Sequence, residues 1–300
     1  MSQSGFSAGL AVRQKLEIAV PPARRRSAIT KRQELELKIT ALQKDYAELH
    51  TAVFEAAQVH RRLCAPRLLR YDDFEIASEI FAVRHLPGDF FTVEETDDGV
   101  ILALGDICGK GLAAGMWTTH IVGLVRAHTA RTSVPEAIVT RVNRDLSLMS
   151  PLRPLASLFL AKLDSATGVL DYCSAGHPPA FLLRANGKLE SLTEGGLLLG
   201  VLADAAYNRG TVKLNFGDML LVYSDGIIES LDNAGEEFGY QRLESQLRSA
   251  QTGSADAVLF SVLGAVQDFA GTRGLVDDMS LVVVRRAASQ AAAFPVMRAA

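Results

Sequence analysis

Four aspartates in this sequence stand where predicted strands begin or end, positions from which carboxylates can converge on a metal ion. They are Asp89, Asp106, Asp225 and Asp277. One acidic residue at a strand end is usually a turn residue or a helix cap. Four in one chain favour a shared site over four independent turns.

Carboxylates gathered at one end of a sheet would repel one another, by roughly 4 kcal/mol per pair of unit charges at ~4 Å and an effective dielectric near 20. Such a cluster needs cations, and its oxygen ligands suit Mg²⁺ or Mn²⁺ rather than Zn²⁺. Two ions held ~3.5–4 Å apart can bind a water between them, lower its pKa and aim it at phosphorus. The pattern therefore predicts two Mn²⁺ or Mg²⁺ ions and phosphoester chemistry.

The loop Gly105-Asp106-Ile107-Cys108-Gly109-Lys110-Gly111 presents one of these carboxylates between a predicted strand and a predicted helix. Its glycines permit positive φ and close approach of the backbone to a ligand. Taken alone, the loop is also compatible with a simple turn or with a phosphate cradle at a helix start. It lacks the spacing of a P-loop or of a dinucleotide fingerprint, which disfavours the cradle.

The composition limits the class of protein. The chain has 300 residues, 48% of them hydrophobic, and a net charge of −3, which argues against a dedicated nucleic-acid binder. Three widely spaced cysteines suggest neither a zinc knuckle nor a disulfide framework and favour a reducing cytoplasm. No apolar run reaches the ~20 residues needed to span a bilayer, and no signal peptide is evident.

Two segments precede the predicted strands. Residues 1–30, with a basic cluster at Arg24-Arg25-Arg26, are expected to form a flexible arm, and residues 31–66 a helix that Pro66 ends. Apolar residues follow an a/d heptad pattern in this helix. They are Leu35, Ile39, Leu42, Tyr46, Leu49, Val53, Ala56, His60 and Leu63. The pattern favours a coiled coil that makes a homodimer, with packing on the helix's own domain as the alternative.

From residue 67 onward, short apolar runs separated by turn signals alternate with helical stretches. Strands are expected at 74–81, 89–93, 100–105, 156–163, 169–173, 180–184, 219–223 and 279–284, with a further strand pair bracketing 215–218. Hairpin turns are expected at Asp97-Asp98-Gly99 and Asn186-Gly187. Helices are expected near 111–130, 134–149 with Ser133 as cap, 239–249 and 254–270. This order predicts an α+β fold with antiparallel sheets.

Five motifs occur in an order and spacing that resemble a known family. They are Pro87-Gly88-Asp89-Phe90-Phe91, Gly105–Gly111, Ala175-Gly176-His177-Pro178-Pro179, Tyr223-Ser224-Asp225-Gly226 and Asp277-Asp278-Met279-Ser280. Together they are similar to the SpoIIE/RsbU branch of the metal-dependent (PPM-type, type 2C-related) serine/threonine phosphatases. The resemblance implies two antiparallel β-sheets packed as a sandwich flanked by helices. It places the phosphatase domain at 67–286 and leaves 287–300 as a loose tail.

The resemblance also implies roles for single residues. Asp106 would bridge both metals, and the carbonyl of Ile107 would bind the second. Asp225 and Asp277 would hold the first, and Asp89 would act on the second through water. Asp278 is a further candidate ligand beside Asp277. The implied reaction is hydrolysis of phosphoserine or phosphothreonine by water held between the metals, without a phospho-enzyme.

The sequence departs from the family pattern at some positions. Thr92 stands where many members carry another aspartate, so one outer carboxylate is missing. Arg84 lies upstream of Asp89 and is a candidate contact for the substrate phosphate. His177 is tempting as a general acid, but its Gly-His-Pro-Pro setting favours a structural role.

The leading hypothesis is a metal-dependent phosphatase acting on a phosphorylated partner protein. The resemblance implies a STAS-domain anti-sigma-factor antagonist as substrate, in a partner-switching pathway. The rivals are a phosphatase-like binding module with weak or no turnover, and another small phosphoesterase. The heptad helix leads almost directly into the catalytic domain, so an upstream regulator is expected to act through it on the helix after Gly111.

Overall fold

The computed structural model describes residues 22–63, 67–83, 86–96, 99–149 and 154–287, with side chains from residue 30 onward. The chain divides into two compact units, with the boundary between Ala52 and Val53. The first unit holds most of one long helix, and the second holds all of the strands and the other helices.

Helix α1 runs from Pro22 to Leu63 and so begins earlier than the expected start at residue 31. Proline is well tolerated in the first turn of a helix, and the Ala, Arg and Lys residues that follow are good helix formers. Ion pairs between residues four positions apart, such as Arg32 with Glu36 at 2.8 Å, add a little to the stability of the helix. The basic cluster at 24–26 therefore belongs to the helix and not to an arm.

The heptad residues of α1 divide into two groups. In the first unit they are exposed: Leu35 by 52%, Leu42 by 66% and Leu49 by 64%. In the second unit they are covered, with His60 only 3% exposed and Val53, Ala56 and Leu63 half-buried. For the last heptad residues of α1, the alternative prediction of packing on the helix's own domain is therefore correct. The exposed apolar residues before it have no partner among the described residues of this chain.

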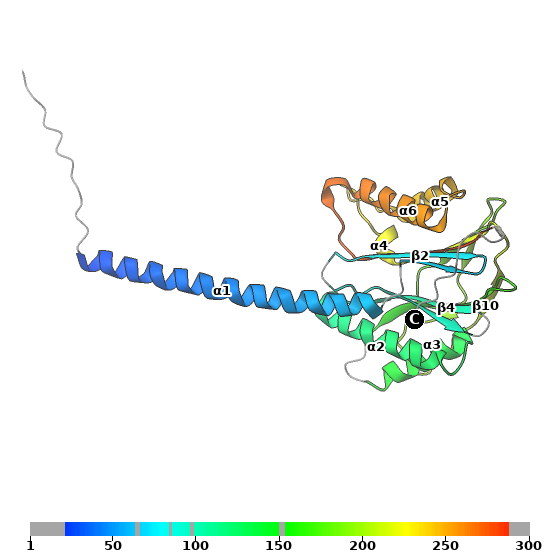
Figure 1. Cartoon of the computed structure of the whole chain (residues 1–300), viewed down its shortest axis with the longest axis horizontal. Helices are drawn as coiled ribbons and strands as arrows, with labels where there is room; N and C mark the ends of the chain where they lie inside the picture. Colours follow the sequence, from blue (N-terminus) through cyan, green and yellow to red (C-terminus); the bar gives the residue numbers. More distant parts are fainter. Residues whose placement is uncertain (1–21, 64–66, 84–85, 97–98, 150–153, 288–300) are drawn as a thin grey trace, which may run out of the picture. The chain divides into compact units, whose positions relative to one another are not determined.

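The second unit contains two β-sheets packed face to face (Figure 1). The first has the order β1 (Leu68–Tyr71), β2 (Phe74–Phe81), β12 (Met279–Arg286), β11 (Met219–Tyr223), β7 (Ala180–Leu183), β8 (Leu189–Leu192). The second has the order β10 (Gly210–Lys213), β6 (Val169–Ala175), β5 (Ala156–Asp164), β4 (Gly99–Ile107), β3 (Phe90–Thr96). Neighbours along both orders are antiparallel, and the short β9 (Gly195–Gly196) adds a parallel pairing with β6.

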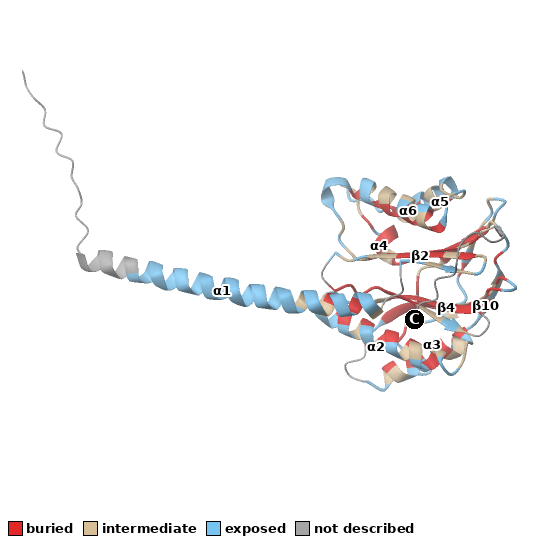
Figure 2. Ribbon diagram, in the orientation of Figure 1, coloured by how far each residue is buried: buried red, intermediate tan, exposed pale blue. Residues whose placement is uncertain are grey.

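Helices cover both outer faces, which completes the α+β sandwich expected from the sequence (Figure 1). Helices α2 (Leu112–Thr129) and α3 (Pro135–Ser147) pack on the second sheet, and α5 (Gly239–Ser249) and α6 (Ala255–Ala270) pack on the first. The short α4 (Asp225–Ile228) follows β11, and a 3-10 turn at Gly271–Arg273 follows α6. Buried residues therefore form three layers: between the sheets and under each helix pair (Figure 2).

Two local expectations were wrong. Ser133 does not cap α3, because the helix begins at Pro135 after Val134 and no side chain caps it. The strands around 215–218 do not pair with each other: β10 joins β6 in one sheet, and β11 joins β7 and β12 in the other. This turn therefore carries the chain across the sandwich, a step that alternation of apolar residues cannot distinguish from a hairpin.

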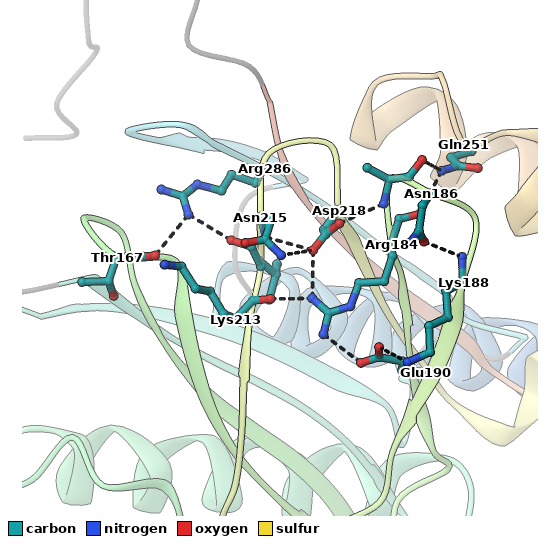
Figure 3. Close-up of polar contacts among 12 residues, drawn as sticks. Thr167, Arg184, Asn186, Lys188, Glu190, Lys213, Asn215, Asp218, Gln251 and Arg286 are labelled. Atoms are coloured by element: carbon teal, nitrogen blue, oxygen red, sulfur yellow. Dashed lines mark hydrogen bonds and ion pairs between the residues drawn. The ribbon is translucent and has the colours of Figure 1, made fainter.

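The crossing turn is held by one buried carboxylate (Figure 3). Asp218 is 2% exposed. Its Oδ2 accepts hydrogen bonds from the Asn215 amide and from Arg184 Nη1, each at 2.9 Å, and its Oδ1 accepts one from the Ala185 amide, also at 2.9 Å. Arg184 in turn binds Glu190 at 2.7 Å. Every charge in this cluster has a partner.

None of the described helices combines the length and the apolar character that a bilayer crossing requires.

Candidate metal site

The antiparallel pairing of β3 with β4 brings two of the predicted ligands together. Phe90 at the start of β3 lies opposite Gly105, so Asp89 and Asp106 are adjacent across the pair. Asp106 and Ile107 are the last residues of β4 rather than the first residues of a loop. The predicted central ligand therefore sits on a strand, where it is positioned more rigidly than on a turn.

Asp89 is fixed from the opposite sheet. It is 1% exposed, and its Oδ2 accepts a 2.8 Å hydrogen bond from the Ser224 hydroxyl. That hydroxyl oxygen accepts a 2.9 Å hydrogen bond from the Ser280 amide, and the Ser224 amide donates to the Ser280 carbonyl at 3.0 Å. The segment that carries Asp225 is thus joined to both Asp89 and the start of β12.

The electrostatics of these carboxyls favour a positively charged ligand. Burial raises the pKa of Asp89 well above its usual range, and the Asp106 carboxylate raises it further. Burial also raises the pKa of Asp106 to about 7, with Asp225, Asp277 and Asp278 adding to the shift. Burial and Asp277 raise the pKa of Asp225. A divalent cation would relieve these unfavourable charges.

Because Gly88 has no side chain, oxygens of the β4 end and of the loop after it face the space that a Cβ would fill. A Cβ at this position would lie 3.0 Å from Asp106 Oδ1, 3.2 Å from the Ile107 carbonyl oxygen and 3.3 Å from the Gly109 carbonyl oxygen. One carboxylate and two carbonyl oxygens around a point are the kind of ligand set that hard cations prefer. The Thr118 hydroxyl of α2 holds the Gly88 carbonyl at 2.9 Å and so ties this cradle to the helix.

The other two predicted ligands meet where α4 begins. A Cβ on Gly226 would lie only 2.0 Å from the Asp278 carbonyl oxygen, so only glycine permits this close approach of the Asp225 turn to Asp277-Asp278. Asp277 Oδ2 accepts a 2.6 Å ion pair from Lys110 Nζ. Both side chains are partly exposed, by 46% for Asp277 and 41% for Lys110.

Asp278 is used differently from its neighbour. Its Oδ1 accepts the Val83 amide at 2.8 Å, and its Oδ2 accepts the Gly88 amide at 3.0 Å. Both oxygens therefore hold the segment that leads into the Gly88 cradle. Arg84, the predicted phosphate contact, lies outside the described residues.

The donors match a hard divalent cation in kind, although the side chains do not enclose one as they lie. No group of three or more His, Cys, Asp or Glu side chains within the described part of the chain could hold an ion by itself. The oxygens that face one space are one carboxylate and two carbonyls, and Lys110 shares Asp277. Water would have to complete the ligands of an ion here, and the lysine would have to release Asp277.

His177 is placed by the structure in a buried setting. It is 6% exposed, its Nδ1 lies 2.8 Å from the Ser157 hydroxyl, and burial lowers its pKa to about 3. A neutral, buried imidazole cannot act as a general acid near neutral pH, which fits the structural role expected from its sequence setting.

Sequence reasoning missed three residues of this site. Ser224 supports Asp89, Thr118 supports Gly88, and Lys110 pairs with Asp277. Ser224 and Lys110 both lie inside recognised motifs, where they could have been singled out as neighbours of a ligand. Thr118 lies on α2 with no local signal, and only the packing of α2 on β3 and β4 reveals it.

Comparison with known proteins identifies the family to which the chain is similar. Residues 96–287 match the family model described as stage II sporulation protein E (SpoIIE). The chain is 24% identical to protein IcfG of Synechocystis sp. over 262 residues, which is 76% of this chain but 40% of that protein. It is also 24% identical to phosphoserine phosphatase RsbU of Bacillus subtilis over 242 residues, 80% of this chain and 71% of that protein.

One solved structure extends the comparison to the fold. The SiaA-PP2C domain of Pseudomonas aeruginosa matches with a TM-score of 0.70 at 17% identity, over 80% of this chain and 97% of that domain. At this identity the likeness establishes the fold, a PP2C-type sandwich.

Proposed function

Because the chain belongs to the SpoIIE family, we propose that it is a metal-dependent protein phosphatase that hydrolyses phosphoserine or phosphothreonine on a partner protein. The observation that carries the proposal is the pairing of buried Asp89 with half-buried Asp106 beside the oxygen cradle at Gly88. The name of the relative RsbU, a phosphoserine phosphatase, supports the same reaction.

The proposed ligands are those that the motifs imply. Asp106 and the carbonyl of Ile107 would hold ions at the cradle, Asp89 would act through water, and Asp225 with Asp277 would hold the other side. Bound Mg²⁺ or Mn²⁺ would supply Lewis acidity and lower the pKa of water. The chain's own contribution is to hold these oxygens in place, through Ser224 on Asp89 and Thr118 on Gly88.

We assign Asp278 to positioning rather than to ligation, since backbone amides use both of its oxygens. Lys110 is proposed to leave Asp277 when a cation binds, because two positive charges compete for the same oxygen. Its released ammonium would then lie at the edge of the site, where a phosphate dianion would arrive.

The finer proposal concerns the substrate. We propose a STAS-type anti-sigma-factor antagonist in a partner-switching pathway, on the resemblance of the five motifs to the SpoIIE/RsbU branch. The test is phosphate release from phosphorylated STAS proteins, with an unrelated phosphoprotein as control. Equal rates on both would remove the STAS assignment while leaving the phosphatase in place.

The reaction itself has a simpler test. Hydrolysis of p-nitrophenyl phosphate should depend on added Mn²⁺ or Mg²⁺ and should disappear in Asp106→Ala. A protein that binds the phosphorylated partner but shows no metal-dependent turnover would instead be a phosphatase-like binding module.

We also propose that α1 both dimerises and receives the regulatory signal. Its exposed heptad residues support a second copy as partner, and Arg126 of α2 donates to the Leu63 carbonyl at 3.0 Å at the end of α1. Leu42→Lys should lower the molar mass measured by light scattering from dimer to monomer, while Thr51→Lys, an exposed position on the opposite face of the helix, should not. A monomeric wild type would contradict the dimer.

A further inference from the structure

A polar cavity distinct from the oxygen cradle at Gly88 lies between the last turns of α1 and strand β2. It has a volume of about 200 Å³, and both sides of it belong to the second compact unit. Its lining includes His60 and Arg61 from α1, Arg67, and Ser78 and Glu79 from β2. A water molecule takes about 30 Å³ in the liquid, so the cavity could admit a ligand larger than one water.

His60 is the feature that points to a ligand. The residue is 3% exposed, yet its Nε2 has no hydrogen-bond partner among the described residues. Burial lowers the pKa of His60, although the charge of Asp278 opposes the shift, so the ring is neutral and can keep an N–H on Nε2. A buried polar atom left without a partner is unfavourable, and a bound acceptor would remove that cost.

The hydrogen-bond donors on the walls indicate the kind of ligand. Arg61 forms no ion pair with any described residue, so its guanidinium is available. Arg67 is held in place by an ion pair with Asp256 and by stacking on Phe260 at 5.2 Å. Arg67 is already compensated by Asp256 and Glu79 is the acidic residue of the wall, so the donors left without a partner among the described residues are the Arg61 guanidinium and His60 Nε2. Guanidinium groups and an imidazole N–H are donors suited to an oxyanion.

We propose that this cavity binds a small oxyanion between His60 and Arg61, at a site separate from the metal cluster. The oxyanion would accept from His60 Nε2 and from the Arg61 guanidinium, and so would join the end of α1 to the edge of the first sheet. Its size limits it to a sulfate, a phosphate or a short carboxylate rather than a nucleotide. The site goes beyond phosphatase activity and requires no metal.

The test is calorimetric titration of sulfate into the full-length protein in EDTA, at constant ionic strength, so that no metal can capture the anion. Wild type should bind sulfate in the millimolar range or tighter. Arg61→Gln and His60→Phe should each raise Kd by about 10-fold or more, since a hydrogen bond to a charged group is worth about 1.5–3 kcal/mol. Arg62→Gln, an exposed neighbour outside the cavity lining, should change Kd less than about 2-fold.

A further variant separates this site from the catalytic proposal. Asp106→Asn should bind sulfate as wild type does, whether or not the protein is a phosphatase. Wild type that binds no sulfate would overturn the proposal and indicate a hydrated cavity. Equal binding by Arg61→Gln, which alters an exposed side chain and should not impair folding, would also overturn it.

Discussion

Two groups of carboxylates in this molecule, one around Asp218 and one around Asp89, differ in what surrounds them. Asp218, 2% exposed, accepts from Arg184 and from the Asn215 and Ala185 amides within 2.9 Å (Figure 3). Asp89, 1% exposed, receives the Ser224 hydroxyl and faces the carboxylate of Asp106. The charge of Asp218 is therefore compensated by a neighbouring cation, whereas that of Asp89 is repelled by a second carboxylate.

The surroundings of a buried carboxylate therefore distinguish a structural role from a role as a metal ligand. A compensated charge stabilises the fold and needs nothing further. Carboxylates that raise one another's pKa destabilise the folded state when they are ionised, and binding of a cation or of protons removes this repulsion. Such groups concentrate at functional sites. Replacing an aspartate by asparagine should therefore lower activity in the group around Asp89 and lower stability in the group around Asp218.

The largest effect is expected for Asp106→Asn. Loss of a central ligand should lower metal-dependent hydrolysis of p-nitrophenyl phosphate by at least about a thousandfold, because metal assistance is worth several kcal/mol. Urea unfolding in EDTA should show unchanged or higher stability, since one of the repelling charges is gone. A variant that keeps more than a tenth of the wild-type rate would contradict the role of Asp106.

Asp218→Asn should do the reverse. It leaves Arg184 less well compensated beside a buried amide, so the free energy of unfolding should fall by about 2–4 kcal/mol. Metal-dependent activity per folded molecule should be kept. Asp204→Asn, at an exposed loop position, is the matched control and should change stability by less than about 0.5 kcal/mol. A loss of activity without a loss of stability in Asp218→Asn would contradict the structural role of Asp218.

The stability of the metal-free protein should depend on pH through the second group. The pKa values of Asp89, Asp106 and Asp225 are raised in the folded state, so the folded protein binds more protons than the unfolded chain between the usual aspartate range and about 7. Stability contributed by these groups is present at low pH and is lost as pH rises through that window.

Thermal unfolding in EDTA should therefore give a lower midpoint at pH 8 than at pH 6. Added Mn²⁺ should raise the midpoint more at the higher pH, where the carboxylates are ionised. Asp106→Asn should flatten this dependence. A wild-type midpoint that rises across the window in EDTA would show that the carboxyls are not destabilised by ionisation.

The smallest effect concerns Lys110. Removing the ammonium frees Asp277, so Lys110→Gln should tighten Mn²⁺ binding by up to about 5-fold, the value of an exposed ion pair of ~1 kcal/mol. It should also raise KM for a phosphate substrate if the released lysine contacts the phosphate. Lys188→Gln, whose ion pair with Glu190 is at the Asp218 cluster, should leave metal affinity unchanged. Weaker Mn²⁺ binding by Lys110→Gln would refute the competition.

Much of the fold followed from local patterns, because β4, β5 and β11 are runs of apolar residues bounded by turn signals and β2 alternates apolar with polar residues. The crossing at 215–218 did not, since an alternating run cannot report which sheet a strand joins. The start of α1 at Pro22 was also missed, because a polar, basic helix has no apolar face to detect.

The site was predictable where spacing within a motif carries the chemistry. Asp89, Asp106 and Asp225 could be named from strand ends, and the register of β3 and β4 then brings the first two together. The use of Asp278 by backbone amides and the contact of Thr118 with Gly88 depend on segments far apart in sequence. No local pattern reports such contacts.

The most direct test of the central distinction is calorimetric titration of Mn²⁺ into wild type, Asp106→Asn and Asp218→Asn, each below its unfolding temperature. Wild type and Asp218→Asn should bind Mn²⁺ with similar affinity, whereas Asp106→Asn should bind at least about 10-fold more weakly. Equal binding by wild type and Asp106→Asn would contradict the assignment of the destabilised carboxylates to a metal site.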